Sequence, residues 1–185
     1  RNARSVVGLK CLAESSAKAG GHMAMTRANF KRAMDKGAVG EGIVRAYLEG
    51  AGWVVYQPMT HGAHCFDLMC IKDKRSSVAF DIKAKARLNF LPATGVNQRH
   101  FDEYKAFSEK HNMPFWIVFV DEGTAQVYGN TIQELEVERK VEGKVYPCVM
   151  PWKPPTRLWP LSAMRSIATL SQAEVLELSA LNQRS

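Results

Sequence analysis

The strongest constraint on the fold is the run Phe115–Val120, which consists of aromatic and β-branched residues. Such a run is typical of a β-strand, and because it has no polar position it is expected to be buried on both faces. A strand of this kind requires a sheet that is covered on each side. A chain of 185 residues is long enough to form one such domain with its own hydrophobic core.

Weaker apolar patterns on both sides of this run predict the remaining elements. Strands are predicted at residues 53–56, 66–71, 78–83 and 126–128, helices at 37–49, 98–111, 132–135 and 171–182, and a hairpin at 140–146. Asn97 precedes one of these helices, and Ser171 with Glu174 forms a capping box for the last one. The order of elements predicts an α/β fold with a mixed sheet and flanking helices.

Two internal stretches and the first residues are expected to lack regular structure. The segment containing Pro92 and Gly95 is predicted as a long loop, and the Pro-rich residues 151–160 as a wrapping or linking stretch. Residues 1–22 show no clean periodicity and are interpreted as an added or disordered leader; a targeting peptide is the alternative, although an apolar core for secretion is missing. The core is therefore expected at 23–150, followed by the Pro-rich segment and a helix at 151–185.

Composition narrows the classes of partner. The net charge of +7 and the pI near 9.3 favour polyanionic partners such as nucleic acid. Because no stretch approaches the roughly 18 apolar residues that span a bilayer, no membrane partner is expected. Four cysteines without a CxxC pair favour a reduced protein in the cytoplasm.

A carboxylate followed two positions later by lysine occurs four times, so the tripeptide alone means little. The four copies begin at Asp81, Glu103, Glu138 and Glu142. The copy at Glu103 falls in a predicted helix, where residues two apart do not face each other, and the last two flank a polar hairpin. Asp81 and Lys83 instead end a predicted strand, in which side chains two apart share a face.

Two further acids complete a candidate site. Asp67 lies in the preceding predicted strand, and antiparallel pairing through the turn at 73–77 brings it towards Asp81. Carboxylates in apolar strands are costly unless positive charge balances them, which a divalent cation and Lys83 would provide. Glu41 lies on the apolar stripe of the first helix between Gly40 and Gly42, which allow another backbone or a ligand to approach. An ordinary salt bridge is the alternative for Glu41.

The order of Glu41, Asp67 and Asp81-Ile82-Lys83, with Gln98 opening the next helix, resembles the PD-(D/E)xK nuclease superfamily. The pattern resembles members related to archaeal-type Holliday junction resolvases and to small phage-type nucleases. Two positions depart from the motif, since Phe66 replaces a proline and Asp81 stands in place of Glu. The resemblance covers residues 37–128 and implies a restriction-endonuclease-like mixed central sheet flanked by helices.

The resemblance also implies a mechanism. Asp67, Asp81 and the Ile82 carbonyl would bind Mg²⁺, with Mn²⁺ as a substitute, and Glu41 would help directly or through water. Lys83 would assist the attacking water, and Gln98 would contact Lys83, a water or the phosphate. The candidate nucleic-acid contacts are Lys85, Arg87, Arg99 and His100. The implied function is metal-dependent hydrolysis of phosphodiester bonds in DNA, with branched or nicked DNA as a sub-hypothesis.

Several alternatives stay open. The chain could be a nuclease-fold module that binds nucleic acid or protein without cleaving, the target could be RNA, and junction cutting would need a homodimer. His61, His64, Cys65 and Cys70 suggest zinc, but no second ligand pair follows, so a loop with incidental histidines is favoured. Trp116, Phe119, Trp152 and Trp159 are interpreted as packing residues in preference to base-stacking ones.

Overall fold

The structure is a computed structural model that describes residues 26–59, 64–73, 76–85, 88, 93–141 and 143–182. Its helices are α1 (Arg27–Gly50), α2 (Gln98–His111), α3 (Ile132–Glu136) and α4 (Gln172–Ala180), with a 3-10 helix η1 (Leu161–Ala163). Its strands are β1 (Val54–Tyr56), β2 (Leu68–Asp73), β3 (Ser76–Ala84), β4 (Ala93–Asn97), β5 (Phe115–Asp121), β6 (Gln126–Thr131), β7 (Arg139–Val141), β8 (Lys144–Tyr146), β9 (Cys148–Met150), β10 (Thr156–Pro160) and β11 (Arg165–Thr169).

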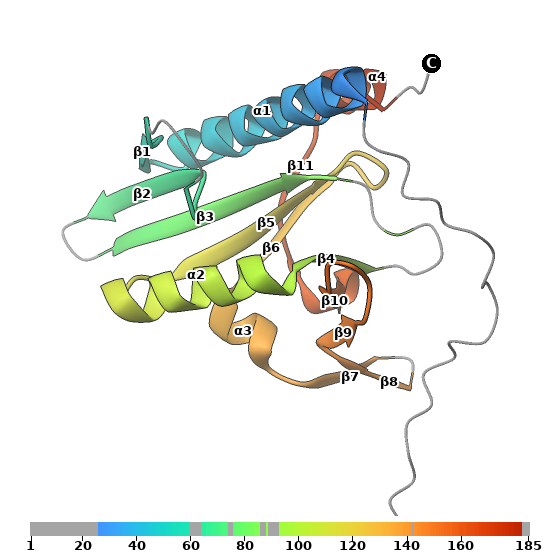
Figure 1. The fold of residues 1–185 in the computed structure, drawn as a ribbon. Coiled ribbons are helices and arrows are strands. Elements are labelled where there is room, and N and C mark those ends of the chain that lie inside the picture. The colour runs from blue at the N-terminus through green and yellow to red at the C-terminus, as the bar shows by residue number, and fades with distance from the viewer. Residues whose placement is uncertain are drawn as a thin grey trace, which may run out of the picture.

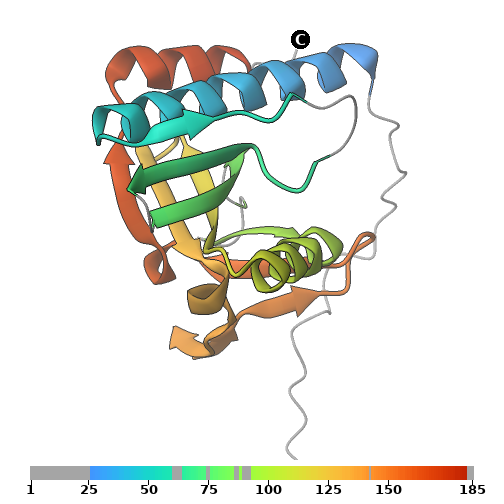
Figure 2. The ribbon, with the colours of Figure 1, turned by 90° about the vertical axis from the view of Figure 1, so that its left-hand side faces the viewer.

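A mixed six-stranded sheet forms the centre of the molecule, in the order β1-β2-β3-β5-β6-β11. β3 and β5 are parallel and are joined through α2, whereas the other neighbouring pairs are antiparallel. Helices α1 and α4 cover one face, and α2 and α3 lie on the other (Figures 1 and 2). The predicted α/β fold with a mixed sheet and flanking helices is confirmed.

Strand β5 is buried on both faces, as its sequence predicts. Val118 and Val120 are fully buried in a core that includes Val44 and Leu48 of α1. Ile117 and Phe119 point the opposite way, into a second core with residues of α2 and α3. Successive residues of a strand alternate between faces, so one apolar run supplies both cores.

N-terminal caps that are visible in the sequence determine where two of the helices begin. The Asn97 side chain accepts a hydrogen bond from the Arg99 amide at 3.0 Å, and α2 has the predicted bounds. The capping box of Ser171 and Glu174 is also present at the start of α4. Helix α1 begins ten residues earlier than predicted, because Thr26 caps it and the charged stretch that follows has no apolar stripe to reveal it.

Two predictions of irregular structure were wrong. The supposed loop around Gly95 contains β4, and the Pro-rich stretch contains β10; the two strands pair antiparallel, with β9 on the far side of β10. Gly95 allows this pairing, since a Cβ there would lie 2.1 Å from the carbonyl oxygen of Arg157. Trp159 is 2% exposed and its indole nitrogen donates to the Leu135 carbonyl at 2.8 Å, which confirms its packing role, whereas Trp152 is 36% exposed.

The last described elements are integrated with the rest of the fold. β11 pairs with β6 at one edge of the central sheet, and Leu178 of α4 is fully buried in the α1-side core. The Lys36 ammonium, on α1, donates to Glu122 at 2.7 Å and to Asn182 at 2.8 Å. Among the described residues, none of the helices has the length and apolar character needed to cross a membrane.

Candidate active site

Asp67 is anchored to β3 by two hydrogen bonds. It lies one residue before β2, rather than within the strand as predicted, and its amide donates to the Phe80 carbonyl at 2.8 Å. One of its carboxylate oxygens, Oδ2, accepts from the Ile82 amide at 2.6 Å. The N–H and C=O of one strand residue point to the same edge, so the Ile82 carbonyl also faces Asp67, beyond the last paired residues of β2 and β3.

Asp81 and Lys83 share a face of β3 and form an ion pair. Lys83 Nζ lies 2.7 Å from Asp81 Oδ1, and the Asp81 side chain is 5% exposed against 30% for Lys83. The second oxygen, Asp81 Oδ2, is buried and has no hydrogen-bond partner of standard geometry among the described residues. A buried carboxylate oxygen without a partner is unfavourable, and it is a free donor atom for a cation.

Glu41 reaches the same region from α1. Gly40 makes this possible, because a Cβ at that position would lie 2.6 Å from the Cβ of Ala84 at the end of β3. The close approach places Glu41, which is half-buried and accepts from Gln57 at 3.3 Å, beside the acids of the sheet. Gly42 needs no such space, since a Cβ there would meet nothing within 4 Å.

Burial and neighbouring negative charge raise the pKa values of Glu41 and Asp67. Burial is the main cause of the raised pKa of Glu41, followed by the negative charge of Asp67. Burial also raises the pKa of Asp67, and the charge of Asp81 adds to it, while the Ile82 amide and Lys83 act in the opposite sense. The acids therefore lie close enough to repel, and one lysine does not neutralise them.

Two residues near these acids were missed as site residues by the sequence analysis. Tyr104 of α2 is 3% exposed, and burial, followed by the nearby charge of Asp81, raises the pKa of its hydroxyl. His64 is exposed and close enough to Glu41 and Asp67 for a positive charge on it to lower their pKa values. A tyrosine on the apolar face of a helix was the available signal for Tyr104, because a buried hydroxyl needs a partner.

Lys85 and Gln98, which were also predicted as site residues, form hydrogen bonds with residues outside the group of acids. Lys85 follows β3, and its ammonium donates to the Gly95 carbonyl; burial, and then the charge of Lys83, lower its pKa to about 8. Within the described part of the chain Gln98 does not bond Lys83, since its amide nitrogen donates to Asp102 at 2.8 Å and its oxygen is buried without a partner there.

The basic residues predicted to contact nucleic acid are only partly described. Arg99 pairs with Glu103 at 3.5 Å on the exposed face of α2, and its guanidinium lies 3.2 Å from His100. The His100 ring lies 6.3 Å from that of Tyr104. Arg87 falls outside the described residues, as does His61 of the suggested zinc cluster.

The residues present suit a hard divalent cation better than zinc. The described part of the chain contains no preassembled group of three or more His, Cys, Asp or Glu side chains for a metal ion. It does bring two carboxylates and a backbone carbonyl to one strand end, with Asp81 Oδ2 unpartnered. All-oxygen ligation of this kind is typical of Mg²⁺, which keeps several of its waters.

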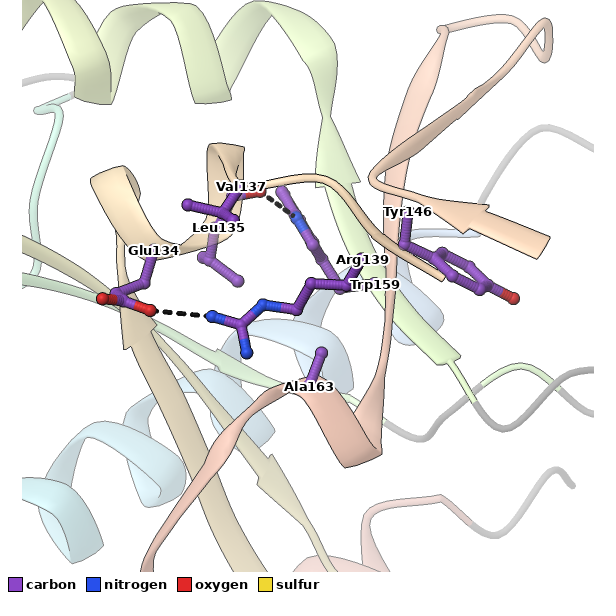
Figure 3. A pocket seen from close by; sticks show the side chains of 7 residues that line it. All are labelled: Glu134, Leu135, Val137, Arg139, Tyr146, Trp159 and Ala163. Carbon is purple, nitrogen blue, oxygen red and sulfur yellow. Dashed lines mark hydrogen bonds and ion pairs between the residues drawn. The ribbon is translucent and has the colours of Figure 1, made fainter. Parts of the chain in front are cut away.

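A small hollow lies among other elements and has its polar groups paired (Figure 3). Its walls are Glu134, Leu135, Val137, Arg139, Tyr146, Trp159 and Ala163. Arg139 binds Glu134 at 2.8 Å across one side, and the Trp159 indole is held by the Leu135 carbonyl. These contacts indicate a packing defect between α3, β7 and β10 rather than a second site.

Comparison with protein families and with curated proteins finds no match to the sequence. Among solved structures, a Holliday junction resolvase from the archaeal hyperthermophile Archaeoglobus fulgidus matches with a TM-score of 0.50 and 15% identity, over 69% of this chain and 90% of the resolvase. The chain has the restriction-endonuclease-like fold. A nuclease from a fusellovirus is also similar, with a TM-score of 0.45 and 12% identity over 81% of this chain and 93% of the viral protein.

The restriction-endonuclease-like fold confirms the sequence resemblance at the level of architecture. In this chain the fold places Asp67 just before β2, Asp81 on the neighbouring strand β3 with Lys83 beside it, and Glu41 on the helix that packs over the end of β3. The chemistry of these residues, rather than the fold, carries the functional argument.

Proposed function

We propose that the chain is a divalent-metal-dependent endonuclease that hydrolyses phosphodiester bonds in DNA. The observation that carries the proposal is the buried Asp81 carboxylate near Asp67, which pairs with Lys83 through one oxygen and whose other oxygen has no hydrogen-bond partner among the described residues. A buried acid with an unused oxygen is unfavourable for stability, whereas it is useful as a ligand. The basic balance of the chain is consistent with a polyanionic substrate.

The proposed roles follow from the positions of the residues. Asp67, Asp81 and the Ile82 carbonyl would hold the cation, and Glu41 would contribute directly or through a bound water. The cation, Mg²⁺ or Mn²⁺, would supply an acidified water and charge stabilisation at the phosphate. Lys83, fixed by Asp81, would orient that water and stabilise the negative charge that develops on the phosphate oxygens.

The test is a cleavage assay on labelled single-stranded, duplex and four-way-junction DNA and on RNA, with Mg²⁺, Mn²⁺ or EDTA. We expect metal-dependent cutting by the natural chain, and none by Asp81→Asn, which keeps the shape of the side chain. Lys83→Ala should cut about 10²–10³-fold more slowly, since it removes a charge that stabilises the transition state. A thermal melt of each variant checks that it remains folded.

Lys140→Ala is the matched control, because Lys140 also follows a carboxylate by two residues but is exposed on β7. This variant should cut like the natural chain. Undiminished cleavage by Asp81→Asn would contradict the proposed site. Cleavage that persists in EDTA would contradict the requirement for a divalent metal ion.

The substrate class within DNA rests on the shared fold alone. The Archaeoglobus fulgidus protein is a Holliday junction resolvase. We extend this to a preference for branched DNA in the present chain, which the junction arm of the assay addresses. Paired cuts on opposed strands would require two copies of the chain, so a homodimer belongs to this part of the proposal.

A binding module with the same fold is the second candidate. Glu41 of α1, Asp67 just before β2, and Asp81 and Lys83 of β3 would then bind nucleic acid or a partner protein without hydrolysis. Tight binding with no cutting of any substrate in Mg²⁺ or Mn²⁺ favours this reading over the enzyme.

A further inference from the structure

Tyr104 lies against the face of β3 that carries Asp81. Its side chain is 3% exposed, and its ring stacks on Phe115 with a centroid distance of 4.8 Å and an interplanar angle of 12°. Phe115 is paired with Ala79 in the register of β3 and β5, and Ala79 and Tyr104 belong to the same core. Since Ala79 and Asp81 are two residues apart, both point to this side of the sheet.

The Asp81 carboxylate has a vacant hydrogen-bonding position on this side. Lys83 occupies Oδ1, and Oδ2 is buried without a partner of standard geometry. Tyr104 is a buried side chain on this same side of the sheet that carries a hydroxyl donor, and burial, followed by the nearby charge of Asp81, raises its pKa. A phenol hydroxyl can donate one hydrogen bond, which is what an unpartnered carboxylate oxygen accepts.

We propose that Tyr104 is a positioning residue, whose hydroxyl donates to the Asp81 carboxylate and fixes the direction in which the carboxylate is presented to the divalent cation. The inference rests on the proposed function of the site. Lys83 cannot fix this direction alone, because its side chain is 30% exposed and it approaches a single oxygen. Stacking on Phe115 immobilises the Tyr104 ring, so the hydroxyl approaches from one direction.

This arrangement corresponds to a general property of metal sites. Groups that hydrogen-bond to a ligand orient it and preserve its affinity, even though they do not touch the metal. In this chain the orienting group is on α2 and the ligand on β3, so the docking of α2 on the sheet becomes part of the metal site. Tyr104 would act through Asp81 and not on the substrate.

The test compares Tyr104→Phe with Tyr128→Phe by measuring Mn²⁺ affinity with electron paramagnetic resonance on the metal-free, full-length chain. Both changes remove one hydroxyl; that of Tyr128 donates to Thr124 at 3.3 Å on β6. We expect Tyr104→Phe to weaken Mn²⁺ binding about tenfold, and Tyr128→Phe to leave it unchanged. Cleavage by Tyr104→Phe should recover towards the natural rate at saturating Mn²⁺, because the defect lies in holding the cation.

Asp81→Asn separates failure of this inference from failure of the proposed function. If Asp81→Asn loses Mn²⁺ and Tyr104→Phe binds it as tightly as the natural chain, the positioning role is wrong and the metal site stands. If the natural chain and Asp81→Asn bind Mn²⁺ equally weakly, both proposals fall. A melting temperature for Tyr104→Phe that matches the natural chain, together with weakened binding, excludes a purely structural role for the hydroxyl.

Discussion

The surroundings of Asp67 act on the pKa of its carboxyl group in opposite directions. The Ile82 amide stabilises its charged form, but burial and the charge of Asp81 outweigh this and raise its pKa. The folded state therefore binds the Asp67 proton more tightly than the unfolded chain, whose value is near 3.8. The stability of the metal-free protein should fall as the pH rises from the unfolded pKa through the folded one.

Asp67→Asn tests this consequence, because the amide oxygen can still accept from Ile82 but no charge develops. We expect the metal-free variant to lose part of the fall in melting temperature between pH 4 and pH 8 that the natural chain shows, with the pH range set by the usual carboxyl pKa values (about 4). It should also lose the stabilisation by Mg²⁺, which at a concentration of about 100 times Kd is worth about 2.7 kcal/mol. Glu138→Gln, an exposed carboxyl on another part of the chain, should change neither.

The ion pair of Asp81 and Lys83 could be predicted from the sequence because the rule behind it is local: side chains two apart in a strand share a face. Tyr104 and the unpartnered oxygen of Asp81 could not be found in this way. They depend on how α2 lies against β3, which is set by contacts between residues far apart in the chain.

Gly40 of helix α1 lies tightly against Ala84 of strand β3, and a comparison of Gly40 with Gly42 tests that contact. Gly40→Ala would place a methyl group 2.6 Å from Ala84 Cβ and push the helix away from the strand, at a cost of about 1–3 kcal/mol. Gly42→Ala has open space and should stabilise the helix by about 0.5–1 kcal/mol. Urea unfolding measures both, and Gly40→Ala should also slow cleavage because it displaces Glu41.

Elements were predictable where their own residues determine them. α2 has a cap in Asn97 and a clear apolar face, and its bounds agree with the prediction. The strands β4 and β10 could not be predicted in this way, because their strand structure depends on pairing with each other across about sixty residues of chain. Taken by themselves, Gly95 and the prolines around β10 indicate loops. In the folded protein Gly95 allows the close approach of β4 to β10, and the prolines are compatible with this pairing.

Over the whole molecule, the buried Lys36 ties three segments together. It binds Glu122 after β5 and Asn182 beyond α4, and Asn182 also donates to Glu122. Lys36→Met would leave Glu122 buried without its charged partner and should reduce the free energy of unfolding by about 3 kcal/mol or more. Adding Glu122→Leu should restore much of this loss, since the unpaired charge is then gone; calorimetry of the two variants decides whether the effects couple.

The pairing of β11 with β6, and of α4 with α1, also sets an order of events during synthesis. The residues proposed for catalysis leave the ribosome well before residues 165–180, which cover β6 and fill the core with Leu178. Until then β6 is an open sheet edge of the kind that pairs with other chains. A nascent chain would thus carry its acids long before it had a fold able to hold them in place, and the emergence of β11 and α4 would decide when the proposed site could form.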